Sequence, residues 1–423
     1  MHFDNLADWL AWQETLNPNE IELGLERCQS VAERMGLKQP TYGFVSVSGT
    51  NGKGSSVAML STIMQQAGYK TGVYTSPHLI RYNERIRING EMATDELLCE
   101  AFQCIDDARG DTSLTYFEFG TLAAYYLFEK QSVDFAVFEV GLGGRLDAVN
   151  MMDANVALVT SIAIDHVDWL GDNRNDIAIE KAGIMRSGHA AVCSDPDAPE
   201  SLVKFAEENN VELYWTDHGY QYDFSDNGWN WSDDQHRYKH LPRPSLRGDF
   251  QLMNAAGVLK TIQCLPSKYK VSEEDIRVGL QSTTLAGRIQ VIPGEVEYIL
   301  DVAHNPHAAK ILANFLQENP IEGKNHILIG MLKDKDSSGV IDEIIPYVDD
   351  WHVAALGGSR GSGSERLVGQ LQATGTDICI FPYASVDAAY TAVKKIAKSG
   401  DRVLVAGSFL TVSAVMKIME RES

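Results

Sequence analysis

The segment Ser48-Gly49-Thr50-Asn51-Gly52-Lys53-Gly54-Ser55 constrains the fold of this chain more than any other. A β-rich run from Tyr42 to Val47 precedes it, and apolar residues follow it at helical spacing from Val57 to Ala67. Glycines allow a tight turn that brings backbone N–H groups close to a ligand, and a helix N-terminus adds partial positive charge. The segment therefore predicts a phosphate-binding loop between a strand and a helix.

Two side chains of this loop have the chemistry of a nucleotide site. We expect Lys53 to reach the outer phosphates and the Ser55 hydroxyl to lie near Mg²⁺. The pattern departs from the common phosphate loop in two places, because Val47 stands where the first glycine is usual and Gly54 separates Lys53 from Ser55. Strand, Gly-Lys pair, hydroxyl and amphipathic helix together favour phosphate binding over a structural turn.

Composition narrows the class of protein. A chain of 423 residues has room for two or three domains, and its formal charge of −22 argues against a general binder of nucleic acid or anionic membranes. The six cysteines are scattered, with no CxxC pair, as expected of reduced thiols. The N-terminus carries an acid rather than a basic signal-peptide region, and no apolar run approaches the ~20 residues that span a bilayer. We expect a soluble, cytoplasmic protein.

Polar side chains follow three predicted strands. Ser76 comes after the strand from Lys70 to Thr75, Glu139 closes an apolar strand that starts at Val133, and His166 lies just past the strand that starts at Val156. An acid at the end of a buried strand is unfavourable unless it is paired or bound to a metal. Since ligands of open α/β sheets sit at the carboxyl ends of strands, we favour a metal ligand at Glu139 over a structural acid.

Several other stretches are ambiguous from spacing alone. The run from Glu22 to Arg27 is typical of a helix entry with a glycine kink, the aromatic run from Leu114 to Gly120 is more typical of a core, and Lys181 suits a solvated helix face. The basic cluster around Arg85 (Arg81, Arg85 and Arg87) forms either a solvated hairpin face or a site for a carboxylated substrate. Residues 211 to 245, with Asp226-Asn227-Gly228, predict an antiparallel excursion.

A second α/β unit begins near residue 286, where the alternation of strand and helix restarts. Its first strand, Val296 to Leu300, ends in Asp301 and His304, and Asn305 followed by Pro306 suits the start of a helix. We therefore expect a domain over residues 1–285 and another over residues 286–423.

Seven motifs, in this order, identify a family: SGTNGKGS, YTSPHL, LTYFEFGTL, EVGLGGRLDAVN, SIAIDHVDWLG, EKAGI and DVAHNPHA. They resemble those of the folylpolyglutamate synthases of the Mur ligase superfamily, most closely the bacterial bifunctional members that also make dihydrofolate. The similarity covers nearly the whole chain and is weakest at 196–245.

The resemblance implies an α/β fold with an N-terminal phosphate-loop ATPase domain, whose parallel-rich sheet has a small antiparallel excursion, and a C-terminal Rossmann-like domain. It implies an ATP- and Mg²⁺-dependent ligase that joins L-glutamate to dihydropteroate and to reduced folates, and we expect a monomer. By position, the nucleotide contacts are Thr50, Asn51, Gly52, Lys53, Gly54, Ser55, Asn254, Arg288 and Asp301. The metal ligands are Ser76, Glu139 and His166.

The same resemblance overrides the interpretations that spacing alone gave to the stretches 22–25 and 115–118. The residues that match the dihydropteroate pocket are Glu22, Leu23, Gly24, Leu25, Thr115, Tyr116, Phe117, Glu118, Leu146, Asp147 and Ala148. The family commonly has Asp where Glu22 stands, so the carboxylate is kept. Lys181 matches the lysine that the superfamily carboxylates, and Lys53, Lys181, His304 and Asp301 are the candidate catalytic residues, with His304 or Asp301 as the base.

Two rival functions stay open at this point. A Mur-type ligase acting on a muropeptide uses similar ATP chemistry, although its acceptor pocket lacks the TYFE and RLDA combination. A nucleotide-dependent switch without ligase activity would leave the second α/β unit, with Asp301 and His304, unexplained.

Overall fold

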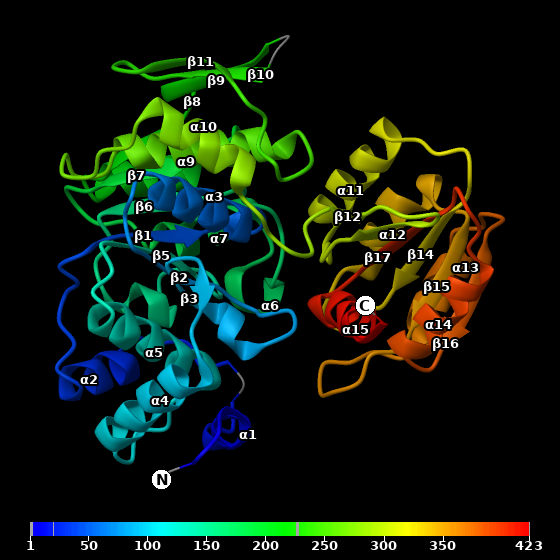
Figure 1. The fold of residues 1–423 in the computed structure, drawn as a ribbon, viewed down its shortest axis with the longest axis horizontal. Coiled ribbons are helices and arrows are strands. Elements are labelled where there is room, and N and C mark those ends of the chain that lie inside the picture. The colour runs from blue at the N-terminus through cyan, green and yellow to red at the C-terminus, as the bar shows by residue number, and fades with distance from the viewer. Residues whose placement is uncertain (1–2, 20, 226–227, 423) are drawn as a thin grey trace. The chain divides into compact units, whose positions relative to one another are not determined.

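The computed structural model describes residues 3–19, 21–225 and 228–422, which fall into two compact units (Figure 1). Unit 1 comprises Met1–Ser245 and Gln251–Thr284, and unit 2 comprises Leu246–Phe250 and Leu285–Ser423. The chain thus enters unit 2 for a short segment, returns to unit 1, and leaves it again at Leu285. In the described part of the chain, no helix is both long and apolar enough to cross a membrane.

Unit 1 is built on an eleven-stranded sheet in the order β11-β10-β9-β8-β7-β6-β1-β5-β2-β3-β4. Its strands are β1 (Gly43–Ser48), β2 (Thr71–Tyr74), β3 (Ile86–Ile88), β4 (Glu91–Met92), β5 (Phe135–Glu139), β6 (Val156–Val159), β7 (Ala190–Cys193), β8 (Glu212–Thr216), β9 (Gly219–Ser225), β10 (Gly228–Ser232) and β11 (Arg237–Leu241). Strand β1 pairs in parallel with both β5 and β6, and β5 pairs in parallel with β2. The three strands that precede Ser76, Glu139 and His166 are therefore neighbours of β1 or of one another.

Helices cover both faces of this sheet, and every residue of β1, β2, β5 and β6 is buried (Figure 1). They are α1 (Leu6–Leu16), α2 (Glu26–Arg34), α3 (Lys53–Gln66), α4 (Asp95–Arg109), α5 (Tyr116–Lys130), α6 (Val167–Leu170), α7 (Arg174–Ala182), α8 (Glu200–Glu208), α9 (Phe250–Gln263) and α10 (Glu273–Ser282), with 3₁₀ turns η1 (Tyr82–Arg85) and η2 (Ala148–Met151). The large core around α5 includes Phe44, Phe119 and Phe138.

Side-chain caps explain where several helices begin. The side chains of Thr94, Thr115 and Asn305 each accept a hydrogen bond from the backbone N–H three residues later, at 3.3, 3.2 and 2.9 Å. At Thr115 the cap is reciprocal, because Glu118 accepts the Thr115 N–H at 2.7 Å. Asn305 with Pro306 at the first helical position begins α11 (Pro306–Glu318), as the sequence predicts.

The region from 211 to 245 differs in part from its prediction. Strand β8 is not antiparallel, because it pairs in parallel with β7 and so extends the main sheet. Strands β9, β10 and β11 do form an antiparallel excursion, which lies at the top of unit 1 in Figure 1. The predicted turn at Asp226-Asn227-Gly228 rests on Asp226 and Asn227, which lie outside the described residues.

Unit 2 has a six-stranded sheet in the order β12-β13-β17-β14-β15-β16. Among the described strands of this sheet, only β12 pairs antiparallel with its neighbour, and the other pairs are parallel. The strands are β12 (Gln290–Ile292), β13 (Glu297–Leu300), β14 (Asn325–Ile329), β15 (Asp350–Ala354), β16 (Cys379–Tyr383) and β17 (Arg402–Ala406). The helices are α11, α12 (Ser337–Ile344), α13 (Ser364–Ala373), α14 (Val386–Ile396) and α15 (Phe409–Glu422), with the 3₁₀ turn η3 (Ile345–Tyr347). The alternation of strands and helices confirms the predicted α/β class.

Candidate active site

The phosphate loop joins β1 to α3, and its glycines have tight surroundings. Gly49 and Gly52 adopt φ angles of +146° and +92°, which L side chains rarely adopt. A Cβ atom at Gly49 would stand 1.8 Å from Thr160 Oγ1, and one at Gly52 would stand 2.5 Å from Asn254 Oδ1. Both the backbone conformation and the lack of space therefore require glycine at these positions.

Hydrogen bonds hold the loop against itself and against a neighbouring segment. Lys53 Nζ donates to the Gly49 carbonyl at 3.0 Å and to the Thr50 carbonyl at 3.3 Å, so its ammonium group lies against the loop itself. Thr50 Oγ1 donates to the Ala163 carbonyl at 2.9 Å, and the Asn51 carbonyl accepts from Ser161 Oγ at 3.1 Å. These contacts join the phosphate loop to the segment that follows β6.

Side chains of helix α9 contact the phosphate loop. Gln251 donates to Ser55 Oγ at 3.3 Å and accepts from Asn254 Nδ2 at 3.0 Å. Asn254 is fully buried, and its Oδ1 finds no hydrogen-bond donor among the described residues. A buried amide oxygen beside a glycine-rich loop is an acceptor for an N–H donor, such as a ligand could supply.

Two of the three predicted metal ligands lie together. Glu139 is buried at the end of β5, and its Oε2 accepts the Ser76 backbone N–H at 3.3 Å. His166 caps the start of α6 with a left-handed backbone, φ 53°. A hydroxyl and a carboxylate are hard oxygen donors of the kind that Mg²⁺ takes. Within the described ranges, no three His, Cys, Asp or Glu side chains are grouped as ligands of one metal.

Lys181 is buried in α7, not solvated as its spacing alone suggested. Burial, and to a smaller extent the positive charge of Lys53, lowers the pKa of the Lys181 ammonium to about 7, although Asp165 opposes the change. At neutral pH a large part of Lys181 is therefore the uncharged amine.

The three segments predicted to form the substrate pocket come together. The Gly24 N–H donates to the Leu146 carbonyl at 3.1 Å, which joins 22–25 to 146–148. Glu22 and Glu118 both bind Arg27, which joins 22–25 to 115–118. A Cβ atom at Gly141 would stand 2.8 Å from the Phe117 ring. The remaining members of the segments are half-buried or buried beside these contacts: Leu23, Leu25, Thr115, Tyr116 and Ala148.

Asp147 also has a structural role that the sequence did not predict. Its carboxylate accepts backbone N–H groups of Gly141 at 3.1 Å, Leu142 at 2.9 Å and Val149 at 3.0 Å. Burial nevertheless raises the pKa of Asp147 to about 6, against the lowering effect of these bonds and of Lys53. The side chain thus shapes the loop that leads from β5 to η2.

The predicted residues of unit 2 form a group of their own. Asp301 accepts the N–H groups of Ile289 and Ala303, both at 2.7 Å, and its burial raises the pKa of the carboxyl. His304 Nδ1 lies 2.8 Å from the Val302 carbonyl, which places the ring proton on Nδ1 and the lone pair on Nε2. Arg288 and His304 both face the Phe409 ring, at 5.2 and 6.2 Å.

Three of these contributors were missed by sequence reasoning: Arg27, Gln251 and Phe409. Gln251 stands three residues before Asn254, so the helical spacing could have indicated that both face the loop. Phe409 gave no local signal, since its partners Arg288 and His304 lie far away along the chain. Arg27 lies five residues from Glu22, but its contact with Glu118, 91 residues away, has no local signal.

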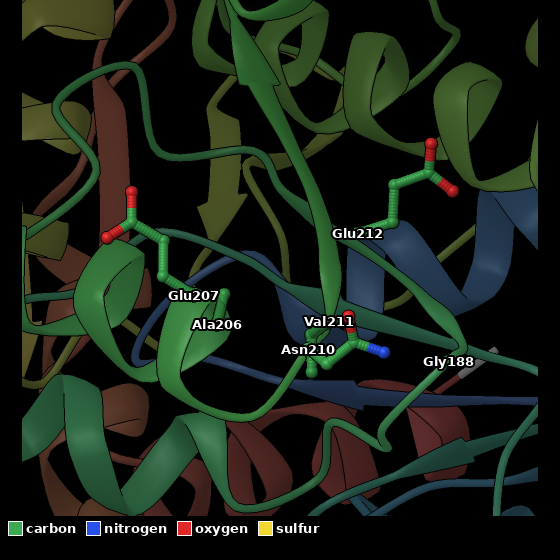
Figure 2. A pocket seen from close by; sticks show the side chains of 6 residues that line it. All are labelled: Gly188, Ala206, Glu207, Asn210, Val211 and Glu212. Carbon is green, nitrogen blue, oxygen red and sulfur yellow. The ribbon is translucent and has the colours of Figure 1, made fainter.

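A surface pocket elsewhere in unit 1 contains no predicted site residue. It lies between α8 and β8 and is lined by Gly188, Ala206, Glu207, Asn210, Val211 and Glu212. Figure 2 shows the Glu207 and Glu212 carboxylates pointing away from one another on either side of Asn210. Nothing in this arrangement converges on a ligand.

Two family models and several curated relatives match most of this chain. A model described as "Mur ligase middle domain" matches residues 47–262, and one described as "Mur ligase, glutamate ligase domain" matches residues 287–409. The "Dihydrofolate synthase/folylpolyglutamate synthase" of Escherichia coli (strain K12) is 43% identical over 415 residues, which cover 98% of this chain and 96% of that protein. That of Haemophilus influenzae is 41% identical over 434 residues, covering 98% of both.

Solved structures show the same fold. The structure described as "E.coli FolC in complex with DHPP and ADP" matches with a TM-score of 0.93 and 42% identity over 99% of both chains. A bifunctional folylpolyglutamate synthase/dihydrofolate synthase with Mn, AMPPNP and L-glutamate bound matches with a TM-score of 0.91 and 43% identity, covering 99% of this chain and 98% of that one. The chain therefore belongs to the dihydrofolate synthase/folylpolyglutamate synthase family of the Mur ligases, and it is an ATP-dependent ligase.

Proposed function

We propose that this ligase joins L-glutamate to dihydropteroate, giving dihydrofolate, and adds further glutamates to reduced folates. The observation that carries the proposal is the meeting of segments 22–25, 115–118 and 146–148 in the unit that bears the phosphate loop. The E. coli relative was solved with DHPP and ADP, and another relative with L-glutamate and AMPPNP. A muropeptide ligase would not need this combination of segments.

The chemistry begins with a carboxylate that does not react with an amine by itself. Attack of the substrate carboxylate on the γ-phosphorus of ATP releases ADP and forms an acyl phosphate. Lys53 stabilises the negative charge on the phosphoryl group as it moves, and the backbone N–H groups of the loop and of the first turn of α3 orient it. The glutamate amine then attacks the acyl carbon, and inorganic phosphate leaves.

The amine must lose a proton before or during its attack. His304 is the better placed of the two candidate bases in unit 2, since the Val302 carbonyl holds its proton on Nδ1 and leaves Nε2 to accept one. Asp301 has both carboxylate oxygens occupied by backbone N–H groups, which suits a contact to the nucleotide better than proton transfer.

The residues suit ATP and Mg²⁺. Thr50 to Ser55 would hold the phosphates, the Asn254 amide, Arg288 and Asp301 would contact the rest of the nucleotide, and Ser76, Glu139 and His166 would hold the metal. When bound, Mg²⁺ would neutralise phosphate charge and orient the γ-phosphate for in-line transfer. The unpartnered Asn254 Oδ1 supports this fit, since an N–H donor of a ligand would satisfy it.

Carboxylation of Lys181 by carbon dioxide is part of the proposal. An uncharged amine attacks CO₂, forming an N–C bond and releasing one proton, and the product is an anionic carbamate. The lowered pKa of Lys181, about 7, provides that amine at neutral pH, and the anion would relieve the repulsion from Lys53. Carbamate oxygens also suit a hard cation such as Mg²⁺.

One assay tests the function: ADP release with dihydropteroate plus L-glutamate, compared with each alone. We expect turnover only with the pair, and also with a reduced folate plus L-glutamate. Turnover with a muropeptide instead would favour the rival ligase, and ATP hydrolysis independent of all acceptors would favour a switch. We also propose that the enzyme is a monomer in the cytoplasm. Its six free cysteines support the cytoplasmic compartment, where disulfides are rare.

A further inference from the structure

Arg27 makes the contacts that join two segments of the proposed pocket. Its NH1 binds Glu22 Oε1 at 2.5 Å and its NH2 donates to the Glu22 carbonyl at 2.7 Å. On the other side, its Nε and NH2 lie 3.2 and 3.0 Å from Glu118 Oε1. One guanidinium therefore holds a carboxylate before α2 and another in the first turn of α5.

Glu118 depends on this contact because it is buried. Only 3% of its side chain is exposed, and its Oε2 is already bound to the Thr115 N–H at 2.7 Å. A buried carboxylate that loses its cation is strongly unfavourable, so it would protonate, move or admit water. Arg27 thus fixes both the charge and the position of Glu118.

The geometry requires arginine rather than any cation. Three nitrogens of the planar group are used at once, on two side chains and a backbone carbonyl. Glu22 is fixed in turn, because its Oε2 accepts from Asn17 Nδ2 at 2.8 Å. A lysine would supply the charge from a single nitrogen and could not span both segments.

The net charge of the cluster of Glu22, Arg27 and Glu118 indicates which kind of ligand group it can bind. Two carboxylates and one guanidinium leave one net negative charge. Glu118 Oε1 already accepts twice from Arg27, whereas Glu22 Oε1, Glu22 Oε2 and Glu118 Oε2 can each accept a further hydrogen bond. Such a site suits a neutral ring rich in N–H donors and repels an anionic group. A pteridine has this chemistry, whereas ATP phosphates and the carboxylates of L-glutamate do not.

We propose that Arg27 is a positioning residue for the pteridine end of both folate substrates, acting through Glu22 and Glu118. The inference rests on the proposed function. Arg27 should affect only the affinity for the pteridine substrate. Changing Arg27 should therefore leave the use of ATP and of L-glutamate as it is in the wild type.

The test compares Arg27→Lys and Arg27→Gln with the wild type and with Arg34→Lys. Arg34 is a matched control on the same helix, exposed, with a contact to Thr112 Oγ1 at 2.8 Å. For both Arg27 variants we expect KM for dihydropteroate and for a reduced folate to rise on the order of 10–100-fold, as when groups that orient ligating side chains are removed. We expect kcat, KM for ATP and KM for L-glutamate to stay within about twofold, a split that a merely structural role would not give.

Each outcome is decisive. Wild-type enzyme that fails to use dihydropteroate would refute the proposed function itself. If the wild type is active, unchanged pteridine KM values in Arg27→Lys, or an equal rise in the KM of all substrates, would overturn the role of Arg27. Loss of folding in both Arg27 variants, seen by circular dichroism, would assign Arg27 to the fold and also overturn it.

Discussion

The Asn254 side chain lies directly against Gly52, so that a Cβ atom at position 52 would stand 2.5 Å from Asn254 Oδ1. Gly52 precedes the lysine of the phosphate loop, and Asn254 comes from α9, about 200 residues later in the chain. The loop and the helix are therefore in mutual contact at a position where a side chain is not tolerated.

Gly52→Ala should abolish nucleotide binding, because the new methyl group must displace Asn254 and the backbone is left-handed. Gly36 is the matched control: its φ is +74°, but nothing lies within 4 Å of its Cβ position. We expect Gly36→Ala to keep its ADP affinity. It should lose only about 1–2 kcal/mol of stability, which is the cost of holding a residue with a Cβ atom in the left-handed conformation. Calorimetric titration with ADP and thermal unfolding measure both effects. Equal ADP affinity in the two variants would contradict the expectation.

Lys53→Ala should abolish both glutamate-adding activities while the protein stays folded, because one phosphate loop activates either carboxylate. The loss of transition-state stabilisation should be on the order of 2.7–4 kcal/mol, as for removal of a key electrostatic donor. Lys204→Ala, at an exposed helix position, is the control and should be fully active. The measurement is kcat/KM with dihydropteroate and with a reduced folate; either activity near the wild-type rate would rule out a single site.

Lys181 should carry a carbamate in the active enzyme. Enzyme equilibrated with ¹³C-bicarbonate should give a carbamate carbon signal that Lys181→Ala lacks, since burial keeps the amine uncharged above pH about 7. Lys181→Ala should lose activity and regain part of it with acetate, whereas acetate should not change Lys204→Ala. An active, metal-loaded enzyme without the signal would show that the lysine works unmodified.

Asp147 should make the stability of the folded protein depend on pH between about 4 and 6. Burial raises its pKa from 3.8 to about 6, so in this range the folded state keeps the proton that the unfolded state has lost. The stabilisation is present below pH 4 and is lost as the pH rises through about 6, by up to ~3 kcal/mol at 1.36 kcal/mol per unit. Asp147→Asn cannot titrate, so the difference between its urea-unfolding curves and those of the wild type at each pH isolates the effect. A constant difference would contradict it.

The sequence predicted the architecture well where local patterns are strong. The strand before the phosphate loop, the buried strand that ends at Glu139 and the helices on either side of Leu114 all form close to their predicted bounds. The class, with two α/β units, is confirmed. Strand β8 was assigned to the wrong pairing because its alternation resembles a hairpin, whereas it pairs in parallel with both β7, which the sequence did not reveal, and β9.

The site was predicted less completely, and the reason is distance along the chain. Motifs located the loop, the strand ends and Asp301, since these follow from strand-to-helix connections. The partners of Glu118 and Ser55 are long-range contacts that no local spacing records: Arg27 is 91 residues from Glu118, and Gln251 is 196 residues from Ser55. The burial of Lys181 was likewise not predicted, although Ile177 and Ala178 lie at helical spacing from it and, like Ala182, are buried on the same helix.

The short passage of the chain through unit 2 at Leu246–Phe250 has a consequence for proteolysis. Phe250 packs against the core of unit 2, although the helix that it begins continues in unit 1. A protease cut near Thr284 therefore leaves unit 1 complete in the first fragment, which also carries Leu246–Phe250 of unit 2, and leaves unit 2 incomplete in the second fragment. The two pieces should stay associated on a gel-filtration column after such a nick, and a fragment that begins at Leu285 should be less stable when it is expressed alone.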